Sequence, residues 1–136
     1  MRQNAQFFSV ALFVEQPDRD FLRRSGMDPD GAYYKGGPGS KYDNPLALAS
    51  YEKKTRRDED KSDLAALITG LQQSGPALEN FLFDNINLPA QINYMATIVV
   101  SQNIDASDKN HYVYRDSEGT GEWHMTPWDL DLTFGP

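Results

Sequence analysis

The sequence of 136 residues contains no cysteine. This absence excludes disulfide bonds, zinc sites built from thiolates and a cysteine nucleophile. Long hydrophobic runs are missing as well, because no apolar stretch reaches the roughly 18–20 residues that are needed to cross a bilayer. We therefore expect no membrane-spanning helix.

Basic residues are few compared with acidic ones. The chain has 13 Lys and Arg against 20 Asp and Glu, which gives a formal net charge of −7. A nucleic-acid backbone requires clustered cations, and the basic residues that cluster, within 53–57, are followed directly by acidic residues at 58–60. Mixed charge of this kind is typical of a solvated surface. We therefore expect no nucleic-acid partner.

Apolar residues are present in normal amounts. Hydrophobic residues make up 39% of the chain and aromatic residues 12%, which is enough for a core. The length suits a single domain or part of one. Its pattern divides into a strand–helix–strand segment at 1–36, an irregular charged connection at 37–60, and helices followed by a β-hairpin at 61–136. This order predicts an α+β fold.

The first segment alternates between strand and turn signals. The aromatic and β-branched run at 7–14 predicts a buried strand. A helix is expected to begin near Asp18 and to end at Gly26. Residues 28–31, Asp-Pro-Asp-Gly, are typical of a turn, and a short strand is expected at 32–35.

Three helices and a hairpin are predicted in the last segment. Apolar residues at helical spacing indicate a helix over 61–73, and a proline at a first-turn position begins a second one at 75. A third helix is expected over 88–102, followed by strands at 112–114 and 122–125 that a glycine-containing turn connects. We interpret the apolar stripe of the third helix as core, and its members are Leu88, Ile92, Met95, Ala96, Val99 and Val100.

The order of three polar residues points to phosphoryl transfer. Asp105 and Asn110 have the spacing D-x-x-x-x-N after the third helix, and Asp129 follows the hairpin. Protein kinases have the same order of helix, D-x-x-x-x-N loop, hairpin and metal-binding aspartate. In that chemistry one aspartate accepts the proton of the attacking hydroxyl, while an asparagine and a second aspartate hold Mg²⁺ against the phosphates.

Spacing alone leaves other interpretations open. Asp and Asn are common in loops, so Asp105 and Asn110 are also compatible with an ordinary turn after a helix. The carboxylates of Asp105, Asp129 and Asp131 are equally compatible with a Ca²⁺- or Mg²⁺-binding domain that does no phosphoryl transfer.

Three motifs in the last third of the chain resemble a known family. Residues 103–105 fit N-x-D, residues 110–114 fit N-x-Y-x-Y, and residues 127–135 fit P-W-D-x-D-x-x-F-G. Together they resemble the CotH kinase family of atypical protein kinases, named after spore coat protein H. Residues 11–16, 31–35 and 51–55 also resemble segments of that family.

The resemblance implies an atypical protein-kinase-like fold, with the metal-binding motif after the hairpin. It implies that ATP and Mg²⁺ or Mn²⁺ are used to phosphorylate hydroxyls of a protein substrate, such as serine. Asp105 would be the catalytic aspartate, and Asn110 a metal or phosphate ligand. Asp129 would be the main metal ligand, with Asp131 as its competitor, because two residues along a strand place both carboxylates on one face.

A kinase also needs a phosphate-binding lysine and an acidic partner for it. By the family pattern Glu15 matches the acidic partner, and Lys35 is the nearest candidate for the lysine, although a lysine at the end of a surface strand is the alternative. No His-Arg pair precedes Asp105, Phe134-Gly135 is two residues removed from Asp131, and no activation-segment equivalent follows. The sequence therefore predicts a partial domain, or fragment, of an atypical member.

Composition does not identify a compartment. The resemblance implies a spore coat or an extracellular or cell-surface location, with a coat or surface protein as the substrate. The same resemblance is compatible with a structural coat or surface module that keeps the fold without the activity.

Overall fold

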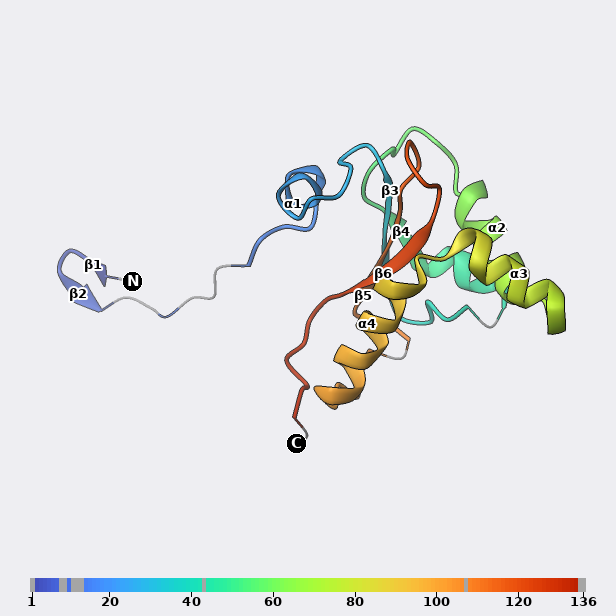
Figure 1. Ribbon diagram of the computed structural model, residues 1–136. Helices are drawn as coiled ribbons and strands as arrows, with labels where there is room; N and C mark the ends of the chain where they lie inside the picture. The colour runs from blue at the N-terminus through green and yellow to red at the C-terminus, as the bar shows by residue number, and fades with distance from the viewer. Residues whose placement is uncertain (1, 8–9, 11–13, 43, 107, 135–136) are drawn as a thin grey trace.

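A computed structural model describes residues 2–7, 10, 14–42, 44–106 and 108–134. Its central feature is a four-stranded antiparallel sheet with the strand order β4-β3-β5-β6 (Figure 1). The strands are β3 (Ala32–Gly36), β4 (Tyr51–Lys53), β5 (His111–Arg115) and β6 (Trp123–Pro127). Helices lie beside this sheet, so the fold is mixed α+β, as predicted.

The pairing of β3 with β5 joins two segments that are far apart in the sequence. Tyr33 lies opposite Tyr114, and Lys35 lies opposite Tyr112. Because successive side chains of a strand point to opposite faces, Tyr33 and Lys35 share one face of the sheet, and Tyr34 lies on the other. The two faces carry separate hydrophobic clusters.

The larger cluster lies between the sheet and helices α2 (Ser62–Leu71) and α3 (Gly75–Asn85). The smaller one lies on the opposite face, where Leu22 of helix α1 (Arg19–Arg24) packs with sheet tyrosines. Figure 1 shows α1 on one side of the sheet and the α2–α3 pair on the other side. The larger cluster includes Tyr34, Leu64, Leu67, Ile68, Val113 and Trp123.

The helices begin and end at capping residues, glycines and prolines that are visible in the sequence. The side chain of Asp18 accepts hydrogen bonds from the first-turn amides of α1, and Gly26 follows that helix with φ +76°. A proline lies at the start of both α3 and α4 (Leu88–Val100), where its missing N–H costs nothing. The four predicted helices are therefore confirmed. None of the helices in the described ranges is long and apolar enough to span a bilayer.

The segment at 37–60 is more ordered than predicted. It contains a 3₁₀ helix, Pro45–Ser50, and the edge strand β4. Tyr51 is buried opposite Gly36 and donates a 2.7 Å hydrogen bond to the carbonyl oxygen of Ser40. The expectation of an irregular connection was wrong because this strand is short and depends on pairing with a distant segment.

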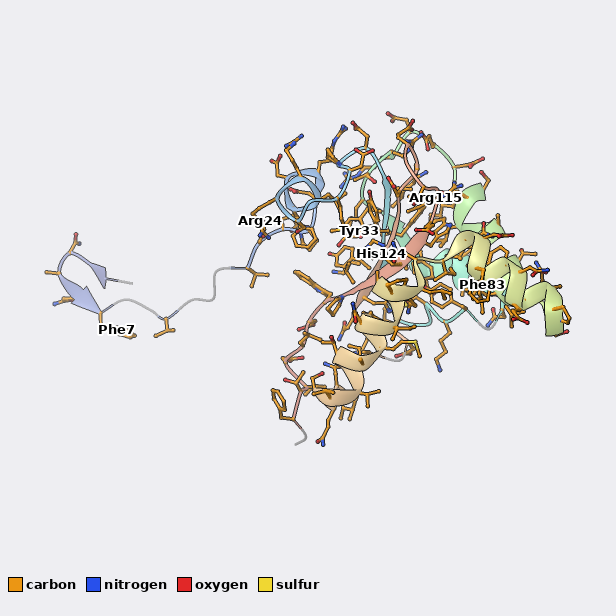
Figure 2. The ribbon with its side chains drawn as sticks, in the orientation of Figure 1. Phe7, Arg24, Tyr33, Phe83, Arg115 and His124 are labelled. Carbon is orange, nitrogen blue, oxygen red and sulfur yellow. The ribbon has the colours of Figure 1, made fainter. Side chains whose placement is uncertain are left out.

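The expected buried strand at 7–14 is wrong for the residues that are described. Gln6–Phe7 forms strand β2, which pairs with Arg2–Gln3 (β1) in a separate hairpin. Phe7 and Val10 are 75% and 84% exposed, and Figure 2 shows Phe7 far from the sheet. Residues 8–9 and 11–13 lie outside the described ranges. An apolar run favours a strand, but burial requires a neighbouring layer.

Helix α4 presents the opposite face from the one expected. Met95 and Val99 of the predicted core stripe are 58% and 75% exposed, whereas Tyr94 is only 9% exposed. The helix meets β6 through Gln91, whose Oε1 accepts a 3.1 Å hydrogen bond from the amide of Met125. Only Leu88 of that stripe packs against the larger cluster. The helical period was correct, but the interpretation of the stripe as core was wrong.

Candidate functional site

The chain reverses direction directly after α4, in the loop that carries Asp105. The backbone at Gln102 has φ +52°, and Asn103 is buried. Oδ1 of Asn103 accepts a 3.1 Å hydrogen bond from the amide of Asp105. This side-chain-to-backbone turn fixes Asp105 at the start of the loop.

The loop closes where Asp105 meets Asn110. Nδ2 of Asn110 donates a 2.8 Å hydrogen bond to Oδ2 of Asp105. Asn110 has φ +59°, a left-handed conformation that asparagine adopts more readily than most residues. The ammonium of Lys109 lies 3.0 Å from the same Oδ2. The structure thus brings together the two residues that the D-x-x-x-x-N spacing singled out.

Two residues that sequence reasoning did not assign to the site hold this loop against the sheet. The amide and hydroxyl of Ser40 both donate to the carbonyl oxygen of Asp108, at 3.0 and 3.1 Å. Nδ1 of His111 donates to the carbonyl oxygen of Lys109 at 3.1 Å, and its Nε2 lies 3.1 Å from the hydroxyl of Tyr51. Burial lowers the pKa of His111, which is 2% exposed. The position of His111 directly after Asn110 was the available signal.

Trp128, the residue before Asp129, connects this part of the chain to Asn110. The amide of Trp128 donates a 3.0 Å hydrogen bond to the carbonyl oxygen of Asn110. Its ring packs edge-on against Tyr112, with centroids 5.6 Å apart. Asp129 itself is exposed and has φ +54°. Asp131 is exposed in a turn rather than on a strand, so the expected shared strand face of these two aspartates is wrong.

The negative charges of the site act on the ammonium group of Lys109. Its pKa is raised, first by the hydrogen bond to Asp105, then by the charge of that carboxylate, and further by the charges of Asp108 and Asp129. Three carboxylates therefore act on one ammonium group. Asp105 and Asp129 lie within the same electrostatic environment although the hairpin separates them in sequence.

Lys35 lies at the edge of the same site. Its Nζ is 5.5 Å from the centroid of the Trp128 ring. A pocket of about 300 Å³ is lined by Lys35, Glu52, Lys109, Asn110 and the glycine-containing segment at 36–38. The pKa of Glu52 is lowered, first by a hydrogen bond from Lys54 and then by the charges of Lys54, Lys35 and Arg57. Lys35 thus shares a pocket with Asn110.

Glu15 lies elsewhere. Both of its carboxylate oxygens accept hydrogen bonds from Arg24 of α1, one of them at 2.9 Å from Nε. The structure therefore pairs Glu15 with Arg24 and does not bring it to Lys35. The acidic residue opposite Lys35 in the sheet is Glu52. Sequence reasoning missed Glu52 because it did not predict β4.

The donor set suits a hard cation that phosphate helps to hold. Among the described residues, no group of three or more His, Cys, Asp and Glu side chains is arranged to bind a metal ion. The three candidate residues offer two carboxylates, from Asp105 and Asp129, and the amide oxygen of Asn110. Mg²⁺ is commonly bound by one or two carboxylates, with water and phosphate oxygens completing its octahedron. These residues therefore fit Mg²⁺ as a partner of a phosphate ligand.

Comparison with known proteins relates this chain to a family and to a curated protein. A family model described as CotH kinase protein matches residues 4–136. The inner spore coat protein H of Bacillus subtilis (strain 168) is 31% identical over 86 residues, which cover 62% of this chain and 24% of that protein. The match thus spans about a quarter of the length of this curated relative.

Proposed function

Because this chain belongs to the CotH kinase family, we propose that it carries part of a site for ATP-dependent phosphoryl transfer to protein hydroxyls of Ser or Thr. In this proposal the fold is a partial atypical kinase-like fold. The observation that carries it is the contact between Asp105 and Asn110, with Asp129 held beside Asn110 through Trp128. These are the residue types, in the order, that phosphoryl transfer uses.

Asp105 is proposed as the base that orients the attacking hydroxyl and accepts its proton. Its side chain is 23% exposed, so an acceptor hydroxyl has access to it. Hydrogen bonds from Asn110 and Lys109 to Oδ2 fix the orientation of the carboxylate. A positioned base of this kind contributes about 10²–10⁴-fold to the rate.

Asn110 and Asp129 are proposed as the ligands of Mg²⁺ or Mn²⁺, with Asp131 as a further carboxylate nearby. When bound, the cation would neutralise charge on the transferring phosphate. The amide nitrogen of Asn110 is used by Asp105, and its amide oxygen is the atom that suits the cation. The exposed carboxylate of Asp129 can bind the cation without first losing a buried partner.

Lys35 is proposed as the residue that binds the phosphates of ATP. It shares a pocket with Asn110, and the charge of Lys35 helps to lower the pKa of Glu52. Glu52 lies opposite Lys35 in the sheet and forms its ion pair with Lys54, and we propose Glu52 as the acidic partner in place of Glu15, which the family pattern suggested.

The name of the relative suggests where such a protein acts. That relative is an inner spore coat protein. We extend this to the present chain as a proposal that it acts at a spore coat or a cell surface, on a coat or surface protein.

A phosphotransfer assay tests the activity. The chain is incubated with radiolabelled ATP, Mg²⁺ and dephosphorylated casein, and incorporation of label into casein and into the chain itself is measured. Asp105→Asn should lower incorporation by about 10²-fold or more. Asp58→Asn, at an exposed position outside the site, is the matched control and should leave it unchanged. Incorporation that is absent in the unaltered chain, or equal in Asp105→Asn, contradicts the proposal.

A further inference from the structure

The indole ring of Trp128 contacts the lysine of the candidate site. Both side chains are partly buried, and the Lys35 ammonium lies over the Trp128 ring, 5.5 Å from its centroid. A cation within about 6 Å of an aromatic face is attracted by the electrons of the ring, and tryptophan attracts cations better than the other aromatic side chains. The Trp128 ring is therefore an electrostatic partner of Lys35.

A wall of aromatic side chains holds the Trp128 ring in place. The ring packs edge-on against Tyr112, with centroids 5.6 Å apart, and Tyr112 stacks on Tyr33 with centroids 4.8 Å apart. Tyr33 and Tyr112 are each 1% exposed, and Tyr33, labelled in Figure 2, packs in the same cluster as Leu22 of α1. Close-packed side chains of this kind rest in defined rotamers. The wall therefore limits where the Trp128 ring can lie.

The backbone of Trp128 is tied to the other side of the site. Its amide donates a 3.0 Å hydrogen bond to the carbonyl oxygen of Asn110, and the residue that follows it is Asp129. One peptide bond and one hydrogen bond thus separate Trp128 from the two proposed metal ligands. Trp128 connects these ligands to Lys35.

The contact with Trp128 leaves the hydrogen-bond donors of Lys35 available. Glu52 lies opposite Lys35 in the sheet, but its carboxylate is 2.7 Å from the ammonium of Lys54. Among the described residues, the Lys35 ammonium takes part in no hydrogen bond or ion pair of its own. An aromatic face attracts a cation without accepting a strong hydrogen bond, so the three N–H donors of Lys35 remain free for a ligand.

This arrangement favours binding of phosphate. Lys35 lines the pocket of about 300 Å³ together with Lys109 and Asn110. A lysine side chain is flexible and loses conformational entropy when a ligand fixes it. A contact that already orients the ammonium reduces this loss, which strengthens binding.

We propose that Trp128 is a positioning residue, which orients Lys35 for the phosphates of ATP and couples this lysine to Asn110 and Asp129. This inference rests on the proposed function and adds to it a residue that acts through another. Trp128 is not among the described residues that line the pocket, so its ring acts on the nucleotide only through Lys35.

The contact itself is tested by NMR without nucleotide. The chain is labelled with ¹³C-lysine, and the signals of Lys35 are identified by their loss in Lys35→Met. Protons over the face of an indole ring are shifted upfield by its ring current. We expect upfield-shifted Cε protons of Lys35 that return to ordinary lysine positions in Trp128→Leu. Unshifted Cε protons in the unaltered chain overturn the proposal.

The role of the contact is tested by a double-mutant cycle. Isothermal titration calorimetry with ATP and Mg²⁺ compares the unaltered chain, Trp128→Leu, Lys35→Met and the double variant. Loss of the contact with the ring should weaken ATP binding by about three- to tenfold. Because Trp128 acts through Lys35, Trp128→Leu should cause no further loss once Lys35 is replaced by Met. An equal loss in both backgrounds means that Trp128 acts only on the structure, and it overturns the proposal.

Two further variants complete the test. Phe134→Leu makes an aromatic-to-leucine change at an exposed position of the same segment and should leave ATP affinity unchanged. If Trp128→Leu does not fold, Trp128→Phe keeps a smaller ring, which should retain part of the shift of the Lys35 protons and weaken ATP binding by about twofold. Unchanged proton shifts and unchanged affinity in a folded Trp128→Phe variant overturn the proposal.

Failure of this inference differs from failure of the proposed function. ATP binding that is equal in the unaltered chain and in a folded Trp128→Leu variant overturns the positioning role and leaves the nucleotide site standing. Shifted Lys35 protons in an unaltered chain that binds no ATP overturn both, because the contact then exists without a nucleotide site for it to serve.

Discussion

The side-chain amide of Asn110 donates a 2.8 Å hydrogen bond to Oδ2 of Asp105, and Lys109 lies 3.0 Å from the same oxygen. One carboxylate oxygen thus receives two donors from a loop that closes within six residues. The carbonyl oxygen of Asn110 in turn accepts a hydrogen bond from the amide of Trp128, the residue before Asp129. Asn110 is therefore the residue through which Asp105 and Asp129 are held near each other.

Substitution of Asn110 separates its backbone role from its side-chain role. Both Asn110→Gly and Asn110→Ala lose the hydrogen bond to Asp105, but only glycine adopts φ +59° without strain. We expect the alanine variant to be less stable than the glycine variant by about 1 kcal/mol in urea unfolding. Both variants should lose Mg²⁺-dependent ATP binding. Retention of that binding in a folded Asn110→Gly variant would show that the side chain is not a ligand.

Removal of the Lys109 charge should strengthen binding of a divalent cation. The pKa of Lys109 is raised by Asp105, Asp108 and Asp129, so its ammonium is a counter-ion to a group of carboxylates that includes the proposed metal ligand Asp129. Because Lys109 is partly exposed, the gain in Lys109→Met should be small, about two- to fivefold in Mg²⁺ affinity. Isothermal titration calorimetry measures it, with Lys41→Met, outside the loop, as the control. Weaker Mg²⁺ binding in Lys109→Met would contradict competition between this ammonium and the cation.

Two tyrosines should respond oppositely to loss of their hydroxyl groups. The hydroxyl of Tyr94 is buried without a partner among the described residues, whereas that of Tyr51 donates to Ser40. Tyr94→Phe should raise the free energy of unfolding slightly or leave it unchanged, and Tyr51→Phe should lower it by about 1 kcal/mol. Chemical denaturation of both variants provides the comparison. A clear loss of stability in Tyr94→Phe would mean that its hydroxyl is already satisfied.

Stability should depend on pH through the two histidines. Burial lowers the pKa of both His111 and His124. The unfolded chain therefore binds more protons than the folded one below about pH 6.5, so the free energy of unfolding should fall as the pH decreases from about 6.5 toward the folded pKa values. The lowered pKa values of Glu52 and Glu59 act only at lower pH. Urea unfolding between pH 7.5 and 5 tests this, and His124→Gln should flatten part of the slope. A slope that His124→Gln leaves unchanged would contradict the contribution of His124.

Local signals account for the helices and for the loop that holds Asp105 and Asn110. Caps, prolines and turn residues placed the helices, and the short spacing between Asp105 and Asn110 predicted a contact that one loop can make. Tyr112 and Tyr114 alternate along β5, and both belong to the smaller hydrophobic cluster. Each of these features depends on neighbours that are close in sequence.

Features that depend on distant pairing could not be predicted. The period of α4 defines a helix and a stripe, but which face packs depends on where β6 lies, and Tyr94 rather than Met95 turned out to be buried. Strand β4 forms only because Tyr51 pairs with Gly36, and it brings Glu52 opposite Lys35. The role suggested for Glu15 came from a pattern along the chain, whereas its partner in space is Arg24.

Asp129 and Asn110 are proposed to belong to a site for ATP with Mg²⁺. The most direct measurement is thermal unfolding of the chain with Mg²⁺ alone and with Mg²⁺ and ATP, in the unaltered chain, in Asp129→Ala and in the exposed control Asp58→Ala. At about 100 times its dissociation constant, a ligand should stabilise the folded chain by about 2.7 kcal/mol, a shift of several degrees. We predict a shift that needs both Mg²⁺ and ATP, persists in Asp58→Ala and is lost in Asp129→Ala. No shift in a well-folded chain, or an equal shift in Asp129→Ala, would contradict a nucleotide site at Asp129 and Asn110.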